Sequence, residues 1–202
     1  MNLKSDFPIL NKKIRDNSIT YLDSAATTQK PIAVINSIKE FYENSYENVH
    51  RGMNSLSIDA TDQFERTRES VKEFINAKST NEVIFTRGAT DSLNIIANSI
   101  VSKFENSGEI LVTELEHHSN YLPWMNICKN SNLELKIIPV DQNGILDEQQ
   151  VINNCNEKTK IIAITHMSNV TGQILDIKKI KNNISKDILI SLDGCQSIAH
   201  CD

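Results

Sequence analysis

The sequence predicts an α/β fold in which helices cover both faces of a mostly parallel sheet. Two observations carry this prediction. From residue 82 onward, short apolar runs of strand length alternate with amphipathic stretches of helix length. The runs are rich in isoleucine, leucine and valine and show little polar alternation, which is typical of parallel strands buried on both faces.

The first part of the chain is predicted to be an arm followed by helices. Residues 1–20 are polar and weakly patterned, so we expect an arm or a short helix there. After Pro31, apolar side chains recur at steps of three and four residues, the pattern of one helical face: Ile32, Ile35, Ile38, Phe41 and Tyr42. A second helix is expected over residues 57–77, with these side chains on its buried face: Phe64, Val71, Phe74 and Ile75.

The rest of the chain is predicted to alternate between strands and helices. The expected strands are residues 82–86, 109–115, 133–140, 160–167 and 187–193. The expected helices between them centre on residues 91–100, 121–128, 147–155 and 176–183. No further crossover follows the last strand, so we expect the domain to be incomplete.

The composition narrows the classes of partner. The net charge of -5 at pH 7 argues against nucleic acid or an anionic membrane as the main partner, because both would require a clustered basic face. The N-terminus contains no apolar core of signal-peptide length, and no apolar run is long enough to span a bilayer, so we expect a soluble, cytoplasmic protein. The four cysteines include no C-x-x-C pair and are expected to be free thiols.

Ligands of open α/β sheets bind beside the carboxyl ends of the strands, so the loops after the strands are the candidate site. In the first loop, Gly88 would let the backbone approach an anion, Thr90 supplies a hydroxyl, and the following helix supplies free N–H groups. These features predict a phosphate-binding loop, although an ordinary helix cap by Thr90 explains the loop equally well by itself. The loop is neither G-x-G-x-x-G nor a P-loop, which argues against a dinucleotide or a nucleoside triphosphate.

The second loop contains two adjacent histidines, His117 and His118. Neighbouring residues of an extended segment point to opposite sides, so the pair is poorly suited to one metal ion, and we predict no metal site. One imidazole is left to face a ligand. For this loop alone, a surface or capping histidine is the favoured interpretation.

The third and fourth loops add polar groups at the same edge. Ser168, Asn169 and Thr171 follow the fourth expected strand and could simply close a turn. Asp193 ends the last strand, where a carboxylate is costly unless it meets a cation or hydrogen-bond donors. The protonated ring nitrogen of pyridoxal 5′-phosphate would be such a partner, with a strand-end cap as the alternative. Together the four loops hold the groups that a pyridoxal phosphate site needs.

Six stretches resemble the class V aminotransferase-like pyridoxal phosphate enzymes, in the branch of the SUF-type cysteine desulfurases and selenocysteine lyases. They are YLDSAATTQKP (21–31), NVHRGMNSLS (48–57), FTRGATDSLN (85–94), ELEHHSNYLPW (114–124), ITHMSNVTGQI (164–174) and SLDGCQS (191–197). They occur in the family's order and extend over nearly the whole chain. The resemblance implies the type I fold of pyridoxal phosphate-dependent transferases.

The resemblance also implies a domain organisation. Residues 1–20 would be an N-terminal arm, and residues 21–202 the N-terminal portion of the cofactor-binding large domain. The rest of the large domain and the C-terminal small domain would be absent. In the family, the lysine that bonds to the cofactor follows the DGxQ motif in a Ser-Gly-His-Lys context, which this sequence does not contain.

The resemblance implies a role for each matching residue. Gly88, Ala89 and Thr90 would hold the cofactor phosphate, and Asp193 would pair with the ring nitrogen. As a catalytic residue, His117 would stack on the ring and assist proton transfer. The remaining expected contacts are Gln196 with the phenolic oxygen, Asn169 with that oxygen and the substrate carboxylate, and His50 and Arg51 near the active-site entrance and the dimer interface.

The activity that the resemblance implies is conversion of L-cysteine, or L-selenocysteine, to L-alanine, with sulfur passed through an enzyme persulfide to an acceptor protein for iron–sulfur cluster assembly. The full-length enzyme would be a homodimer. Without the lysine, the persulfide cysteine and the C-terminal arginine of the family, the chain is expected to be an inactive fragment; Cys195 and Cys201 do not match the family's nucleophile motif. The alternatives are a non-catalytic remnant, a half-subunit that needs a separate C-terminal chain, or, less favoured, another class V enzyme.

Overall fold

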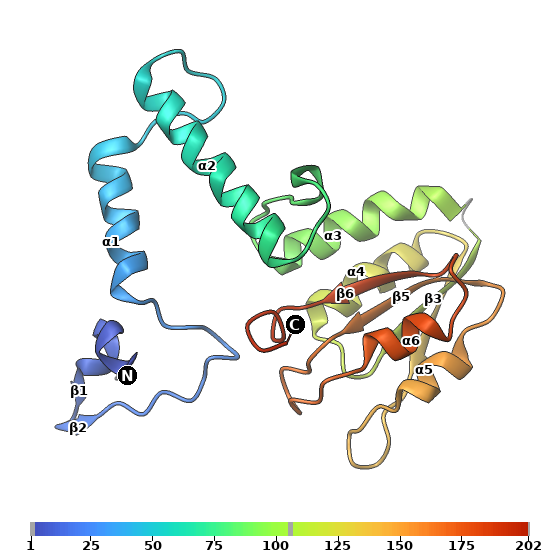
Figure 1. Ribbon diagram of the computed structural model, residues 1–202. Helices are drawn as coiled ribbons and strands as arrows, with labels where there is room; N and C mark the ends of the chain where they lie inside the picture. Colours follow the sequence, from blue (N-terminus) through green and yellow to red (C-terminus); the bar gives the residue numbers. More distant parts are fainter. Residues whose placement is uncertain (1–2, 105–106, 202) are drawn as a thin grey trace. The chain divides into compact units, whose positions relative to one another are not determined.

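The computed structural model describes residues 3–104 and 107–201 (Figure 1). It divides into two compact units, an N-terminal unit, Met1–Phe85, and a C-terminal unit, Thr86–Asp202. Among the described residues, no helix is both long enough and apolar enough to cross a membrane.

The N-terminal unit is mainly helical. Its regular elements are the short 3-10 helices Leu3–Asp6, Pro8–Asn11 and Thr80–Glu82, the hairpin strands β1 (Lys13–Ile14) and β2 (Asn17–Ser18), helices α1 (Ile32–Glu40) and α2 (Ser55–Phe74), and the π-helical turn Phe41–Ser45. Asn54 caps α2, where its Oδ1 accepts a hydrogen bond of 2.9 Å from the Ser57 N–H. Both helices that the periodicity predicts are therefore present.

The apolar faces of these two helices are less buried than the sequence predicts. Ile38 of α1 is 56% exposed, and Phe74 at the end of α2 is 70% exposed. Ile75, which follows Phe74, is exposed as well. Phe64 and Val71 are partly buried. Apolar periodicity indicates which side of a helix would contact a partner, but it does not show that the partner belongs to the same unit.

The expected strand at residues 82–86 is wrong. No strand forms there, and Ile84 is 74% exposed. A strand needs a neighbour that completes its ladder of backbone hydrogen bonds, and no described residue provides one here. Instead, the Arg68 guanidinium donates a hydrogen bond to the Val83 carbonyl oxygen and lies 5.0 Å from the centre of the Phe85 ring.

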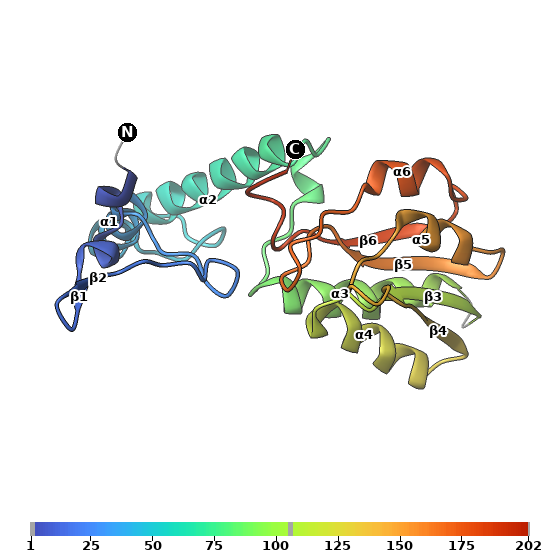
Figure 2. The same cartoon turned by 90° about the horizontal axis from the view of Figure 1, so that it is seen from below.

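The C-terminal unit is a four-stranded parallel sheet with helices on both sides (Figures 1 and 2). Its elements are α3 (Ala89–Ile100), a 3-10 turn (Val101–Phe104), β3 (Gly108–Thr113), α4 (His118–Lys129), β4 (Leu133–Ile138), α5 (Glu148–Asn154), β5 (Thr159–Thr165), α6 (Ile177–Asn182) and β6 (Leu189–Asp193). The strand order is β4-β3-β5-β6, and each neighbouring pair is parallel. The other four expected strands are thus confirmed.

Side chains that alternate along the central strands fill two separate cores. Leu111 and Ile164 face α5 and α6 and pack in one cluster with Ile180. Val112 and Ile161, on the opposite face, pack with helices α3 and α4; this second cluster includes the buried Trp124. Figure 2 shows the two helix pairs on opposite sides of the sheet. This arrangement explains why the strand sequences lack polar alternation.

We expect Ile164→Ala to lower the free energy of unfolding of the C-terminal unit by about 2–5 kcal/mol, because it leaves a cavity in a fully buried core. The matched control is Ile137→Ala in β4, whose side chain is 45% exposed and whose loss should cost under about 1 kcal/mol. Urea unfolding followed by the fluorescence of Trp124, the single tryptophan, measures both. Equal losses would contradict this assignment of the core.

Candidate functional site

The turns that follow β3, β4 and β5 surround a cavity of about 370 Å³. Its lining comes from residues 114–118 after β3, Val140 and Gly144 after β4, and residues 168–171 after β5. The cavity therefore lies at the carboxyl edge of the sheet, where ligands of open α/β sheets bind. It brings together two of the predicted site residues, His117 and Asn169.

His117 is the N-cap of α4. Its Nδ1 accepts a hydrogen bond of 3.2 Å from the Ser119 N–H and lies 2.8 Å from Ser119 Oγ. These contacts orient the imidazole, and the residue remains exposed at the cavity. Capping a helix and facing a site, which the sequence presents as alternatives, thus occur together in this histidine.

Asn169 lies in a tight turn held by its neighbour. The Ser168 hydroxyl oxygen accepts hydrogen bonds of 3.2 Å from the N–H groups of Val170 and Thr171. Ser168 is buried, whereas Asn169 is exposed at the cavity. Ser168 therefore closes the turn, as the simpler interpretation of this loop expects, and leaves the Asn169 amide available to a ligand.

Glu116 is a site residue that the sequence does not single out. Its Oε1 accepts hydrogen bonds from Thr113 Oγ1 (2.6 Å) and from the Thr165 N–H (3.0 Å), and its Oε2 accepts one from Asn120 Nδ2 (2.6 Å). The donors come from the ends of β3 and β5 and from the first turn of α4. The only signal in the sequence is a glutamate between an apolar strand and a helix N-terminus, which is common and unspecific.

The Glu116 carboxyl group is partly buried, and its pKa is raised from 4.5 to about 7. Desolvation by burial is the largest cause, and the negative charge of Asp193 adds to it. The three hydrogen bonds act in the opposite direction, because they favour the ionised form. Burial outweighs them, so protonated and ionised forms coexist near neutral pH.

Asp193 ends β6 with only 7% of its surface exposed. Its Oδ1 accepts a hydrogen bond of 2.9 Å from the Cys195 N–H, and its carbonyl oxygen accepts one of 2.9 Å from the His166 N–H. Gln196 follows in the turn after β6 and is partly buried. The predicted carboxylate at the carboxyl edge is therefore in place, with its charge acting on Glu116.

The Gly88 loop begins α3 at the same edge of the sheet (Figures 1 and 2). Gly88 is the N-cap with a φ of 142°, a value that favours glycine, and a Cβ there would meet no atom within 4 Å. Thr90 is exposed, and its hydroxyl makes no hydrogen bond within the described residues. Arg87 pairs with Asp91 at 3.3 Å, and its hydrogen bonds lower the pKa of Asp91. The first N–H groups of α3 and the Thr90 hydroxyl can thus meet an anion.

The predicted entrance residues His50 and Arg51 belong to the N-terminal unit, so their relation to the other predicted site residues stays a prediction. His50 has a φ of 70°, and its Nε2 lies 3.3 Å from Glu65 Oε1. Its ring meets the Phe64 ring edge-on, with 5.6 Å between centres. Arg51 is exposed.

Comparison with known proteins gives a consistent result. The family model described as aminotransferase class V matches residues 20–202. The chain belongs to the class V aminotransferase family. The resemblance seen in the sequence and the expected α/β fold class are therefore confirmed.

Several members of this class V family are named as cysteine desulfurases. A probable cysteine desulfurase of Staphylococcus aureus (strain COL) is 45% identical over 197 residues, which cover 96% of this chain and 48% of the relative. The structure of a cysteine desulfurase from Thermococcus onnurineus NA1 matches with a TM-score of 0.87 at 31% identity, over 98% of this chain and 48% of that one. One from Escherichia coli matches with a TM-score of 0.82 at 30% identity, over 98% and 49%. The chain spans about half the length of the curated relatives it matches.

None of the cysteines with a shifted pKa in this class V chain is an activated thiol. Burial raises the pKa of Cys128 to about 11 and also raises that of Cys155. The pKa of Cys195 is raised to about 11, first by partial desolvation of the thiol and then by its hydrogen bond to Asp193 and the charge of that residue. The structure records all four cysteines as free thiols, as expected.

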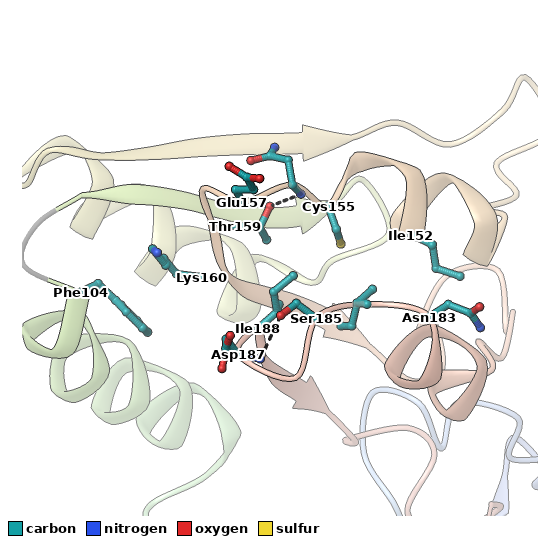
Figure 3. Close-up of a pocket in the computed structure, with 12 residues that line it drawn as sticks. Phe104, Ile152, Cys155, Glu157, Thr159, Lys160, Asn183, Ser185, Asp187 and Ile188 are labelled. Carbon is teal, nitrogen blue, oxygen red and sulfur yellow. Dashed lines mark hydrogen bonds between the residues drawn. The ribbon is translucent and has the colours of Figure 1, made fainter.

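A larger hollow of about 650 Å³ lies at the amino ends of β5 and β6, opposite the edge that carries the site residues (Figure 3). The turns at its rim are held by hydrogen bonds between neighbouring residues. One of them runs from the Asn156 N–H to Thr159 Oγ1 at 3.0 Å. Its charged side chains, Glu157, Lys160 and Asp187, are spread around the hollow and do not converge (Figure 3). None of the predicted site residues lines it.

The pKa of Glu116 predicts a pH-dependent stability. Folded Glu116 binds its proton more tightly than the unfolded residue, so the folded chain loses stability as the pH rises from 4.5 through about 7. Glu116→Gln lacks this proton. We expect the free energy of unfolding of this variant, relative to that of the wild type, to rise by up to about 3 kcal/mol across that range. Urea unfolding at several pH values measures both proteins. The matched control is Glu134→Gln, which removes an exposed carboxylate of β4; an equally steep trend there would contradict the assignment.

The environment of Cys195 predicts its reactivity. We expect iodoacetamide to alkylate Cys195 slowly at about pH 8, and Asp193→Asn to increase that rate several-fold, because it removes a negative charge and a hydrogen-bond acceptor beside the thiol. Mass spectrometry of the alkylated peptides gives the rate. Cys128 is the internal control, since burial alone raises its pKa; a parallel increase at Cys128 would indicate general loosening instead.

Proposed function

We propose that this chain is part of a cysteine desulfurase and that its C-terminal unit holds pyridoxal 5′-phosphate at the carboxyl edge of the sheet. The observation that carries the proposal is the buried Asp193 carboxylate at the end of β6. His117 and Asn169 line a cavity at the same edge of the sheet, and Glu116, which also lines it, feels the charge of Asp193. The names of the relatives, cysteine desulfurases, support L-cysteine as the substrate.

The residues present fit this cofactor by their chemistry. A carboxylate with 7% exposure needs a cation or several donors, and the Cys195 N–H and thiol that contact Asp193 carry no charge. The N–H of a protonated pyridine ring supplies both a charge and a donor. At the same edge, the start of α3 offers free N–H groups and the exposed Thr90 hydroxyl to a phosphate.

Each residue then has a stated part in the proposed function. Gly88, Ala89 and Thr90 bind the phosphate, and Asp193 holds the proton on the ring nitrogen. When bound, the cofactor supplies a conjugated ring that accepts electrons from the α-carbon of an amino acid. Further contacts with the phenolic oxygen and the substrate are assigned to Gln196 and Asn169.

His117 stacks on the ring in this proposal. Its Nδ1 is engaged by Ser119, so a proton that the imidazole takes up or releases in the reaction is handled at Nε2. The cavity beside it has no lysine in its lining, as far as the structure describes the chain. We therefore assign to this chain the noncovalent contacts, and we assign the covalent lysine and the sulfur-accepting cysteine to the part of the relatives that it does not span.

The same proposal extends to the wider role. Persulfide transfer to an acceptor protein for iron–sulfur cluster assembly, a homodimer of the full-length enzyme and a cytoplasmic location follow from the resemblance to desulfurases. A half-subunit that pairs with a separate C-terminal chain would use the same residues in the same way. A non-catalytic remnant would keep the fold and lose the cofactor.

The test is binding of pyridoxamine 5′-phosphate, which has the ring and the phosphate but no aldehyde to react with surface lysines. We expect Asp193→Asn to weaken its affinity at least about tenfold, since a hydrogen bond to a charged group is lost. Asp187→Asn, in the exposed turn just before the same strand, is the matched control and should bind like the wild type. A fluorescence titration measures the three dissociation constants; equal values would contradict the site.

A further inference from the structure

Glu116 links the two sides of the candidate site. It directly precedes His117, and its Oε1 accepts a hydrogen bond of 3.0 Å from the Thr165 N–H at the end of β5. Thr165 is the register partner of Asp193 in the neighbouring strand β6. The next residue, His166, donates its N–H to the Asp193 carbonyl oxygen at 2.9 Å. An unbroken series of contacts therefore crosses the sheet edge from the turn of His117 to Asp193.

The other oxygen of Glu116 ties the same turn to helix α4. Oε2 accepts a hydrogen bond of 2.6 Å from Asn120 Nδ2, and Asn120 Oδ1 accepts one of 3.3 Å from Trp124 Nε1. Asn120 and Trp124 have no exposed surface, so this part of the network has little freedom to move. His117 caps the same helix, and a shift of the Glu116 carboxylate would therefore shift the imidazole.

We propose that Glu116 is a positioning residue of the cofactor site, which fixes His117 relative to Asp193 and couples its own charge to the charge of Asp193. This inference rests on the proposed function, because it takes His117 and Asp193 to contact the same pyridine ring. Glu116 itself does not touch the ring in this assignment. It acts through the two residues that do.

The coupling follows from two like charges in a partly desolvated place. Asp193 disfavours the ionised form of Glu116 and contributes to its raised pKa of about 7. A ring N–H cation at Asp193 cancels this repulsion and favours ionised Glu116, the form that accepts all three hydrogen bonds. Since coupling is reciprocal, ionised Glu116 strengthens the binding of that cation. Binding therefore releases a proton from Glu116 near neutral pH.

Other titratable side chains lie on the turns around Glu116. Glu114, His117 and His118 belong to its own turn, and His166 follows β5. Asp193 is the charge that acts on the Glu116 carboxyl group among the residues that the structure describes. A comparison of variants at each pH cancels the titration of the other groups and that of the ligand.

The experiment is a titration of the full 202-residue chain with pyridoxamine 5′-phosphate at about pH 6, 7 and 8. The dissociation constant of Glu116→Gln, divided by that of the wild type, should be near one at the lowest pH and rise to about fivefold at the highest. Glu134→Gln removes an equal charge from an exposed position and should give a constant ratio. Benzyl phosphate, which has no ring nitrogen, should give a constant ratio with Glu116→Gln.

Two further measurements separate the possible outcomes. Glu116→Asp keeps the charge on a shorter side chain, so it should weaken binding but keep the wild-type dependence of the dissociation constant on pH. Circular dichroism confirms that each variant folds. A ratio that is independent of pH for Glu116→Gln, while Asp193→Asn still weakens binding, would overturn the inference and leave the proposed function standing. Failure of the wild type to bind pyridoxamine 5′-phosphate, or binding that is insensitive to Asp193→Asn, would overturn both.

Discussion

The parallel pairing of β3, β5 and β6 determines which side chains can act together in this protein. Because all strands of the sheet run in one direction, their carboxyl ends meet at one edge. The strands themselves are apolar and face two cores, so the polar groups of the candidate site lie in the turns at this edge. The cavity, the Glu116 network and Asp193 all depend on that register.

The polar edge has an energetic cost that the proposed cofactor would offset. Two carboxyl groups lie close enough for one to raise the pKa of the other, so the two charges repel each other when both groups are ionised. A bound cation would remove much of this repulsion, so the arrangement agrees with the proposed binding of a positively charged ring. Burial acts on Cys128 and Cys155 in the same direction as on Glu116, since it raises the pKa of their thiols.

Much of this organisation could be predicted from the sequence, because strand, helix and loop order depends on local patterns. Four of the five expected strands form, and His117 and Asn169 meet at one cavity as their positions after strands predict. The prediction of a strand at residues 82–86 was wrong, because a strand needs a neighbouring strand to pair with and the local sequence does not show whether one is present. Glu116 was missed for a related reason: one of its donors, Thr165, lies 49 residues away in the chain.

The three donors of Glu116 differ in how strictly they restrict the residue type at their positions. Thr113 and Asn120 give hydrogen bonds from their side chains, so few residue types could replace them without leaving the carboxylate short of a partner. Position 165 contributes a backbone N–H, which every residue except proline possesses. Positions 113 and 120 therefore need a side chain that can donate a hydrogen bond. Position 165 can carry another side chain and still make its contact.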